Sequence, residues 1–478
     1  MSAGGAIARL RARFGDLWWW SAIIFLACRS GDAIQAFAGL WLVPKMVGEA
    51  ELGAALPLLQ FSSVFALPLS IVTIPFSRWL SIYSVRGEYG KIKRMLSIVF
   101  WGAGAVFVLS ILLARFVLPA YFERLRVAEG SLGILLIAAG IAGPLSSVFT
   151  SSLQGLRRFG AVAVSNVVGA PLRLVVLLVA MPFRALSGYL LGQIAAPAAT
   201  TAIALASLRH DLGAKVRSVA LGRRDLGEML RYTWPVAISS VVVCLASAWQ
   251  ALLIRQRLPE VESAAFYVIS RLAETAAYAG TTITLVMFPL AAEAKERGDV
   301  RGELALLKRV ILGSFAPGAA IALVFAFASR QIFSLVSVWE PYAQYAPLTA
   351  LHTLRTALGS SLVVAGLFEM AAGRFKYLVV YLPIVLFETG ALVVLTGWGA
   401  VEPYAPLWMT DAVAALAPAR LSFFVKWLFA SAVLQAAALA AFFAVRAIRS
   451  RQRRQAVYPT PTTTSTSTST PSRKARQP

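Results

Sequence analysis

The stretch FLACRSGDAIQAF, Phe25 to Phe37, lies in the first long hydrophobic run of the chain and has two charges, Arg29 and Asp32, at its centre. A charge in the middle of a spanning helix costs about 2.5–3.5 kcal/mol on insertion scales. Arg29 and Asp32 are three residues apart and share one helical face, which Gln35 and Gly39 continue. The run can therefore span a membrane if this face contacts a partner or water.

The composition places this run in a polytopic membrane protein. The 478 residues are 58% hydrophobic and only 14% charged, unlike an ordinary soluble domain. A spanning helix needs about 20 mainly apolar residues, and the apolar runs predict an all-α fold with about twelve such helices. We expect them near residues 20–43, 52–80, 95–118, 131–155, 160–182, 186–207, 229–254, 263–290, 309–330, 345–370, 377–397 and 421–446.

The positive charges alternate from one connection to the next. The N-terminus holds Arg9, Arg11 and Arg13, and every second connection after it is basic, including the one near 208–228, whereas the connections on the opposite side hold few cations. Cytoplasmic loops carry the excess of lysine and arginine, so the net charge of +23 indicates topology rather than a nucleic-acid partner. We expect a multi-pass protein of the inner (cytoplasmic) membrane with both termini in the cytoplasm.

A weak internal repeat divides the chain. The separation from Glu51 to Arg86 equals that from Glu262 to Arg297, and the motif LRRFGAVAV of the first half is echoed by AGRFKYLVV in the second. Short basic loops can recur by chance, but two echoes at nearly the same offset favour a duplication. Halves with an even number of spans share one orientation and are related by a pseudo-two-fold axis along the membrane normal.

This repeat predicts two six-helix lobes with a cavity between them. We expect an N-terminal lobe at 1–207, a basic cytoplasmic linker at 208–228 and a C-terminal lobe at 229–450. The segment 451–478 is rich in serine, threonine, proline and basic residues, a composition typical of disorder.

Motifs of enzymes and metal sites are missing from the sequence. No G-x-x-x-x-G-K-[ST] motif occurs, and neither His210 nor His352 belongs to a metal-binding pattern. Cys28 and Cys244 both fall in predicted spans and favour neither a disulfide nor a zinc site. We therefore expect a protein that is not an enzyme, with no catalytic residues, no metal and no cofactor.

Ionisable and polar residues within the predicted spans are the candidate site, because such residues usually face a cavity or a partner. Guanidinium groups offer a planar fork of donors that suits a phosphate. The predicted substrate-binding residues are Arg29, Arg173, Arg271 and Arg355; the predicted pairing or ion-coupling residues are Asp32, Glu274 and Glu388; the predicted polar cavity residues are Gln35 and His352.

Each of these residues also has a purely structural interpretation. Arg271 and Glu274 are three residues apart and can simply neutralise each other. Arg173 and Arg355 have no acidic residue three or four positions away, although Arg173 can lie near the cytoplasmic end of its helix. Glu388 is nearly alone in its span and is either a protonatable coupling group or a neutral buried carboxyl.

Two longer motifs carry a family resemblance. LQGLRRF at Leu153–Phe159 and FYVISRLAETAAYAGTTITLVMFPLAAEAKERGD at Phe266–Asp299 resemble polysaccharide biosynthesis proteins, the O-antigen type flippases of the multidrug/oligosaccharidyl-lipid/polysaccharide exporter (MOP) superfamily. The resemblance implies two lobes around a cationic cavity. It also implies alternating-access movement of a polyprenyl-diphosphate-linked oligosaccharide for surface polysaccharide export. The implied partners are a lipid-linked anionic glycan, membrane lipids and a glycosyltransferase or polymerase complex.

Two alternatives remain open at this stage. A cation-coupled multidrug exporter of the same superfamily would use Asp32, Glu274 and Glu388 to bind a proton, a sodium ion or a cationic drug. A membrane polysaccharide polymerase or ligase would need catalytic groups in a large outer loop, and the longest predicted outer loop, 398–420, holds few charged residues. The excess of deep arginines favours the flippase.

Overall fold

The computed structural model describes residues 31, 33–127, 132–156, 158–211, 213, 216–281, 300–371, 373–395 and 421–457. Every regular element in these ranges is helical. In chain order the elements are η1 (Ala38–Leu42), α2 (Val43–Met46), α3 (Glu49–Val85), α4 (Tyr89–Leu125), α5 (Leu132–Gly155), α6 (Phe159–Ala180), α7 (Ala185–Asp211), α8 (Arg223–Arg257), α9 (Glu260–Thr281), α11 (Val300–Leu335), η2 (Glu340–Tyr345), α12 (Pro347–Ala371), α13 (Leu378–Leu395) and α15 (Leu421–Val457).

The predicted all-α membrane fold is confirmed. Within the described ranges, 9 helices are long and apolar enough to cross a membrane, and the shorter apolar helix Leu378–Val393 adds to them. Some helices are longer than the predicted spans: α4 begins at Tyr89 rather than near 95 and ends at Leu125 rather than near 118. Charged residues stop a hydropathy run, but they do not stop the backbone hydrogen bonding of a helix that projects into the interface.

The predicted linker is shorter in the structure. Because α7 continues to Asp211 and α8 already begins at Arg223, only the residues between them connect the two helices. Lys93 Nζ donates to two backbone oxygens of this connection at 2.9 Å each, those of Gly213 and Val216. The connection is thereby held against the start of α4.

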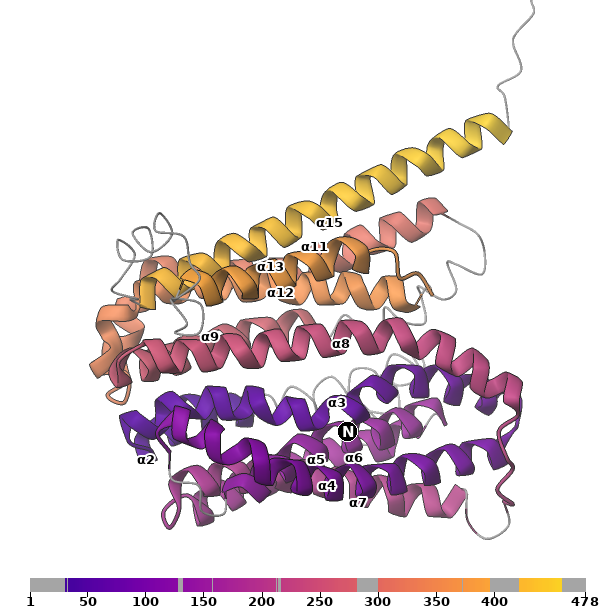
Figure 1. Cartoon of the computed structure of the whole chain (residues 1–478), viewed down its shortest axis with the longest axis horizontal. Coiled ribbons are helices and arrows are strands. Elements are labelled where there is room, and N and C mark those ends of the chain that lie inside the picture. The colour runs from indigo at the N-terminus through magenta and orange to yellow at the C-terminus, as the bar shows by residue number, and fades with distance from the viewer. Residues whose placement is uncertain are drawn as a thin grey trace, which may run out of the picture.

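Two bundles of helices lie side by side (Figure 1). In the first bundle α5 packs on α3 and α7, and α6 packs on α7; in the second, α12 packs on α9, α11 and α15. The bundles meet where α3 packs extensively on α8 and α9. The lobe boundaries, the pseudo-two-fold axis and the total of about twelve spans stay predictions.

Glycines allow the helices of the first bundle to approach closely. A Cβ atom at Gly188 of α7 would lie 2.6 Å from the backbone nitrogen of Met181, at the end of α6, and one at Gly140 of α5 would lie 2.2 Å from the backbone oxygen of Ser62 in α3. No side chain fits at such distances. The small-residue pair Gly188 and Gly192 is thus a packing motif of the kind that membrane helices use.

Candidate functional site

The described part of the first predicted span contacts arginines from both bundles. Gln35 Oε1 accepts a hydrogen bond of 2.6 Å from Arg173 Nη1 of α6. One turn further along, a Cβ atom at Gly39 would lie 3.3 Å from Arg271 Cδ of α9. The predicted polar face of this span therefore brings two of the predicted substrate-binding residues to one helix.

The two charged residues predicted on this face, Arg29 and Asp32, lie outside the described residues. In the sequence they precede Gln35 and Gly39 at helical spacing. Their roles stay predictions.

Arg271 is held in place by its own helix. Arg271 Nη1 lies 2.6 Å from Glu274 Oε2, and the guanidinium carbon lies 5.4 Å from the centroid of the Tyr267 ring. The Arg271 side chain is only 11% exposed, against 30% for that of Glu274. The pairing predicted from the spacing of three is thus present, and the aromatic face adds a cation–π contact.

His352 is buried in the second bundle. Its Nε2 lies 3.3 Å from Ser270 Oγ of α9, and its ring packs at 5.2 Å against that of Phe266. Among the residues that the structure describes, Nδ1 of His352 has no hydrogen-bond partner. His352 is thereby connected to the helix that carries Arg271, as a buried polar residue beside the candidate site.

Arg355 of α12 and Glu388 of α13 interact electrostatically without direct ion-pair contact, and Tyr381 of α13 lies in the same range of Arg355. Glu388 is 5% exposed, and its Oε2 accepts a hydrogen bond of 2.7 Å from Gln435 Nε2 of α15. Glu388, nearly alone in its own span, thus has a polar partner on another helix, which local spacing does not reveal.

Gln435 is a residue of this site that the sequence analysis missed. It is 8% exposed, and its side chain also lies 3.5 Å from Ser431 Oγ one turn earlier. Gln435 could have been found from the sequence as an uncharged amide within an apolar stretch, because polar groups buried in a membrane usually form hydrogen bonds with one another.

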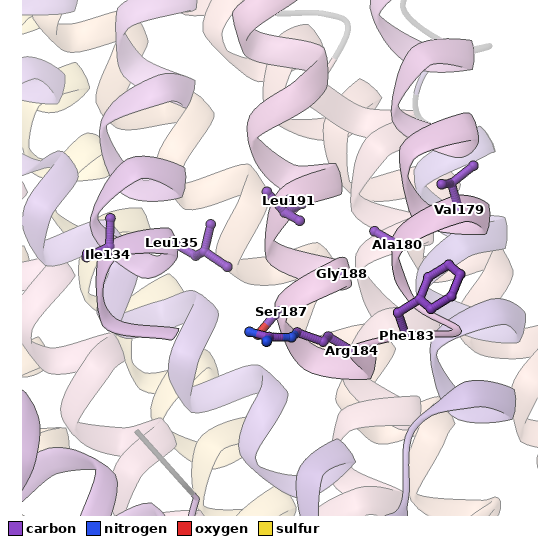
Figure 2. Close-up of a pocket in the computed structure, with 9 residues that line it drawn as sticks. All are labelled: Ile134, Leu135, Val179, Ala180, Phe183, Arg184, Ser187, Gly188 and Leu191. Atoms are coloured by element: carbon purple, nitrogen blue, oxygen red, sulfur yellow. The ribbon is translucent and has the colours of Figure 1, made fainter. Parts of the chain in front are cut away.

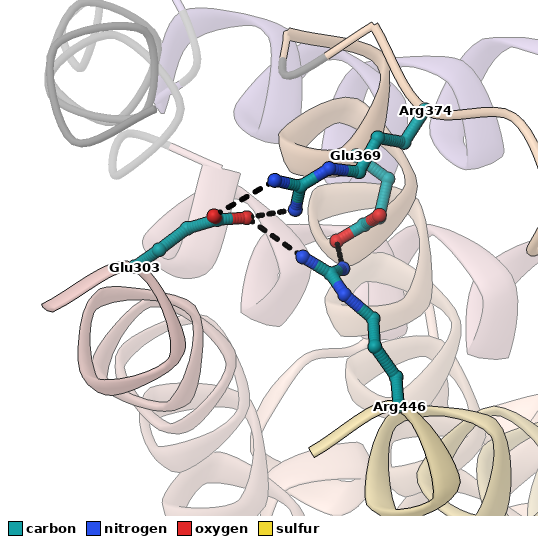
Figure 3. A network of polar contacts seen from close by, with 4 residues as sticks. All are labelled: Glu303, Glu369, Arg374 and Arg446. Atoms are coloured by element: carbon teal, nitrogen blue, oxygen red, sulfur yellow. Dashed lines mark hydrogen bonds and ion pairs between the residues drawn. The ribbon is translucent and has the colours of Figure 1, made fainter. Parts of the chain in front are cut away.

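A second charged network joins three helices of the second bundle at one end (Figure 3). Glu303 of α11 accepts hydrogen bonds from both Arg374 and Arg446, two of them at 2.9 Å, and Arg446 also binds Glu369 of α12. The carboxylate side chains of Glu303 and Glu369 are each 3% exposed. This closed network of opposite charges fixes the helix ends and gives Glu369 a structural role.

Hydrogen bonds join the bundles where α8 ends and α9 begins, and an ion pair of 3.0 Å between Lys91 of α4 and Asp225 of α8 joins them at the opposite end. Arg255, which is 5% exposed, donates from Nη2 to a backbone oxygen near the start of α3 at 3.1 Å. Ser263 Oγ donates to the backbone oxygen of Gly53 at 3.1 Å. We call this region the closed end; its hydrogen bonds are Arg255 to Ala50, Ser263 to Gly53 and Trp339 to Leu40.

The pocket in Figure 2 lies away from the contact between the bundles. It has a volume of about 480 Å³ and is formed by α5, α6 and α7 of the first bundle. The guanidinium of Arg184 lies beside Ser187, and the other lining side chains are apolar (Figure 2). Its position on one bundle makes it a poor candidate for a path between the two.

Within the described ranges, no group of His, Cys, Asp and Glu side chains could hold a metal ion. Cys244 is a free thiol whose Sγ lies 3.1 Å from Ser63 Oγ. The chemistry of the described site is therefore that of hydrogen bonding and charge: guanidinium groups, two carboxylates and amides in an apolar surrounding.

Comparisons with known proteins agree with this architecture. Residues 76–295 match the model of a family described as polysaccharide biosynthesis protein. An inward-facing and an outward-facing structure of a multidrug resistance MATE family transporter of the MOP superfamily match with a TM-score of 0.60 each, at 14% and 15% identity. They cover 91% and 92% of this chain and 96% and 97% of theirs. No curated protein matches the sequence.

A further structure resembles the chain at 16% identity and a TM-score of 0.55, covering 90% of this chain and 96% of its own. It is a MOP superfamily transporter from Pyrococcus furiosus whose binding pocket is described as reversed in polarity, suggesting a different function. The chain is thus a polytopic membrane protein with the fold of MOP superfamily transporters. The match over 76–295 confirms the resemblance to polysaccharide biosynthesis proteins.

Proposed function

We propose that this protein is a flippase that moves a polyprenyl-diphosphate-linked oligosaccharide across the inner (cytoplasmic) membrane for export of a surface polysaccharide. Both termini face the cytoplasm in this proposal, and the protein is a transporter rather than an enzyme. The observation that carries it is the approach of Arg173 and Arg271, one from each bundle, to the same face of the first span. The family match over 76–295 supports it.

The chemistry of this arrangement suits a diphosphate. Arg173 donates to the neutral amide of Gln35, and Arg271 pairs with Glu274, so two guanidinium groups approach one helix face. Each guanidinium can bind two phosphate oxygens at once. Arg29 would add a further guanidinium group to this site.

Transport by this site requires the closed end to open. We propose that the closed end faces outward, as the basic connections predict, so that the site is reached from the cytoplasm in the present conformation. Opening would break the hydrogen bonds of Arg255 and Ser263 with α3 and expose the first-span face to the other side. Glu388, beside Arg355, is the candidate proton or sodium coupling group.

The test is translocation of a fluorescent polyprenyl-diphosphate-linked oligosaccharide in proteoliposomes. Hydrogen bonds to charged groups contribute about 1.5–3 kcal/mol, so Arg173→Gln and Arg271→Gln should each lower the rate by roughly 10- to 100-fold. Arg330→Gln is the control, because Arg330 is an exposed residue of α11. Unchanged rates in both site variants at equal protein amounts would refute the proposal.

A cation-coupled drug exporter is the second candidate, and the buried carboxylate of Glu388 is the observation that favours it. In that case Glu388→Gln would abolish extrusion of a cationic dye such as ethidium, while Arg173→Gln would leave extrusion intact. The opposite pattern, with loss of glycolipid translocation in Arg173→Gln and no dye extrusion by the wild type, separates the flippase from the exporter.

A further inference from the structure

A second pocket lies between the two bundles and opens sideways. It has a volume of about 630 Å³, within the range of ligand sites in proteins. Helices α3 and α4 form its wall on one side, and α8 and α13 form its wall on the other. Side chains that define these walls are Phe61, Val117, Leu245, Leu252 and Leu386. We call this pocket the α4–α8 groove.

The α4–α8 groove is apolar along its length and charged at one end. Arg124 lies in the last turn of α4 and belongs to the lining. Its side chain is exposed, and no acid in the described part of the chain forms an ion pair with it. Tyr121 presents its ring to the groove, because its hydroxyl is already bound to the backbone oxygen of Pro57 at 2.9 Å. One cation thus ends a long hydrocarbon-lined surface.

The surroundings of the groove indicate what fills it. Exposed apolar side chains line its edges, among them Val117 at 50%, Leu245 at 48% and Leu386 at 57% exposure. Val117 and Leu245 lie on helices that are long and apolar enough to span a membrane, and Leu386 lies on the shorter apolar helix α13. Hydrocarbon chains of the bilayer therefore contact the groove directly. Arg124, at the end of a spanning helix, lies where phosphate headgroups lie.

We propose that the α4–α8 groove binds one phospholipid with an anionic headgroup, with an acyl chain between α4 and α8 and the phosphate at Arg124. An acyl chain gains no hydrophobic free energy on leaving the bilayer for the groove. Selectivity therefore comes from the headgroup, and Arg124 attracts an anionic one more strongly than a zwitterionic one. This site is separate from the transported substrate and does not rest on the proposed function.

The pocket in Figure 2 resembles the groove in having a mainly apolar lining and a single arginine, Arg184. That pocket is formed by one bundle, whereas the α4–α8 groove takes its walls from both. A lipid in the groove consequently contacts both bundles and stabilises the arrangement in which the closed end is formed. Separation of α4 from α8 would release it.

Native mass spectrometry of the full-length protein, exchanged into equimolar phosphatidylglycerol and phosphatidylcholine with identical chains, tests the headgroup preference. The wild type should retain phosphatidylglycerol preferentially, and Arg124→Gln should lower the ratio of the two retained lipids about fivefold, as expected for loss of one arginine near a phosphate. Arg115→Gln is the matched control, since Arg115 is an exposed residue of the same helix outside the groove lining. An equal ratio in wild type and Arg124→Gln overturns the proposal.

Filling the groove tests the place of the acyl chain. Leu245→Trp on α8 and Leu386→Trp on α13 each place a large side chain in the same wall of the groove. Each should lower the retention of both lipids. If one variant is not monodisperse, the other alone provides the test. Retention at the wild-type level in a monodisperse filled variant overturns the proposal, because the lipid would then bind elsewhere. A second protein copy in place of lipid in the wild-type spectrum, or displacement of the lipid by inorganic phosphate alone, would also overturn it.

Discussion

Replacing Gly53 with alanine should weaken the closed end. A Cβ atom at Gly53 would lie 2.9 Å from Ser263 Oγ, 3.0 Å from Ser263 Cβ and 3.4 Å from the backbone nitrogen of Ala264. The first two distances force Ser263 or its helix to move, and overpacking of this kind costs about 1–3 kcal/mol. The displaced hydroxyl also loses its hydrogen bond to the Gly53 oxygen, which contributes about 1 kcal/mol.

Together these effects should shift the ratio of closed to open conformations at this end by about 30- to 850-fold, which corresponds to about 2–4 kcal/mol. The size swap Gly53→Ala with Ser263→Gly is the matched control. It removes both close atoms and leaves only the ordinary 3.4 Å contact with Ala264. The swap should restore closure except for the lost hydrogen bond.

The conformation can be measured by double electron–electron resonance between nitroxides at Glu51 and Leu335. Both side chains are exposed, and they belong to α3 and α11 at the closed end. The labels require removal of the native thiols by Cys28→Ser and Cys244→Ala. Gly53→Ala should increase the population at the longer distance. The reasoning is refuted if Gly53→Ala leaves the distance distribution unchanged, or if the size swap opens the end as much as the single variant does.

Two further results are expected. Glu303→Gln should lower the free energy of unfolding by about 2–3 kcal/mol, because two arginines lose their shared carboxylate. Thermal unfolding in detergent would measure this loss of stability, with Glu340→Gln as the control because Glu340 is exposed. Gly188→Val should prevent close packing of α7 on α6 and lower the yield of monodisperse protein; a normal yield would contradict that role.

Much of the helical architecture was predictable from the sequence. A bilayer excludes unpaired backbone groups, so each long apolar run has to be a helix, and α5, α6 and α12 follow the predicted ranges closely. The ends were less predictable, because charged residues such as those that begin α8 continue the helix beyond the apolar run.

Within the site, the sequence was informative where partners are local. Arg271 and Glu274 form the ion pair that their spacing predicts. Gln35 and Arg173 come from distant segments, as do Arg355 and Glu388, so no helical periodicity relates the members of either pair.

The sequence by itself determined that this chain is an all-α membrane protein with charged helix faces, because hydropathy and a period of 3.6 residues are local properties. Only the tertiary structure decided which charges meet. It placed Arg173 and Arg271 at one helix face, brought Arg355 within electrostatic range of Glu388, and closed one end through Gly53 and Ser263. The physical reason is that these contacts depend on how separate helices pack, and packing is set by shape complementarity over the whole bundle rather than by any one segment.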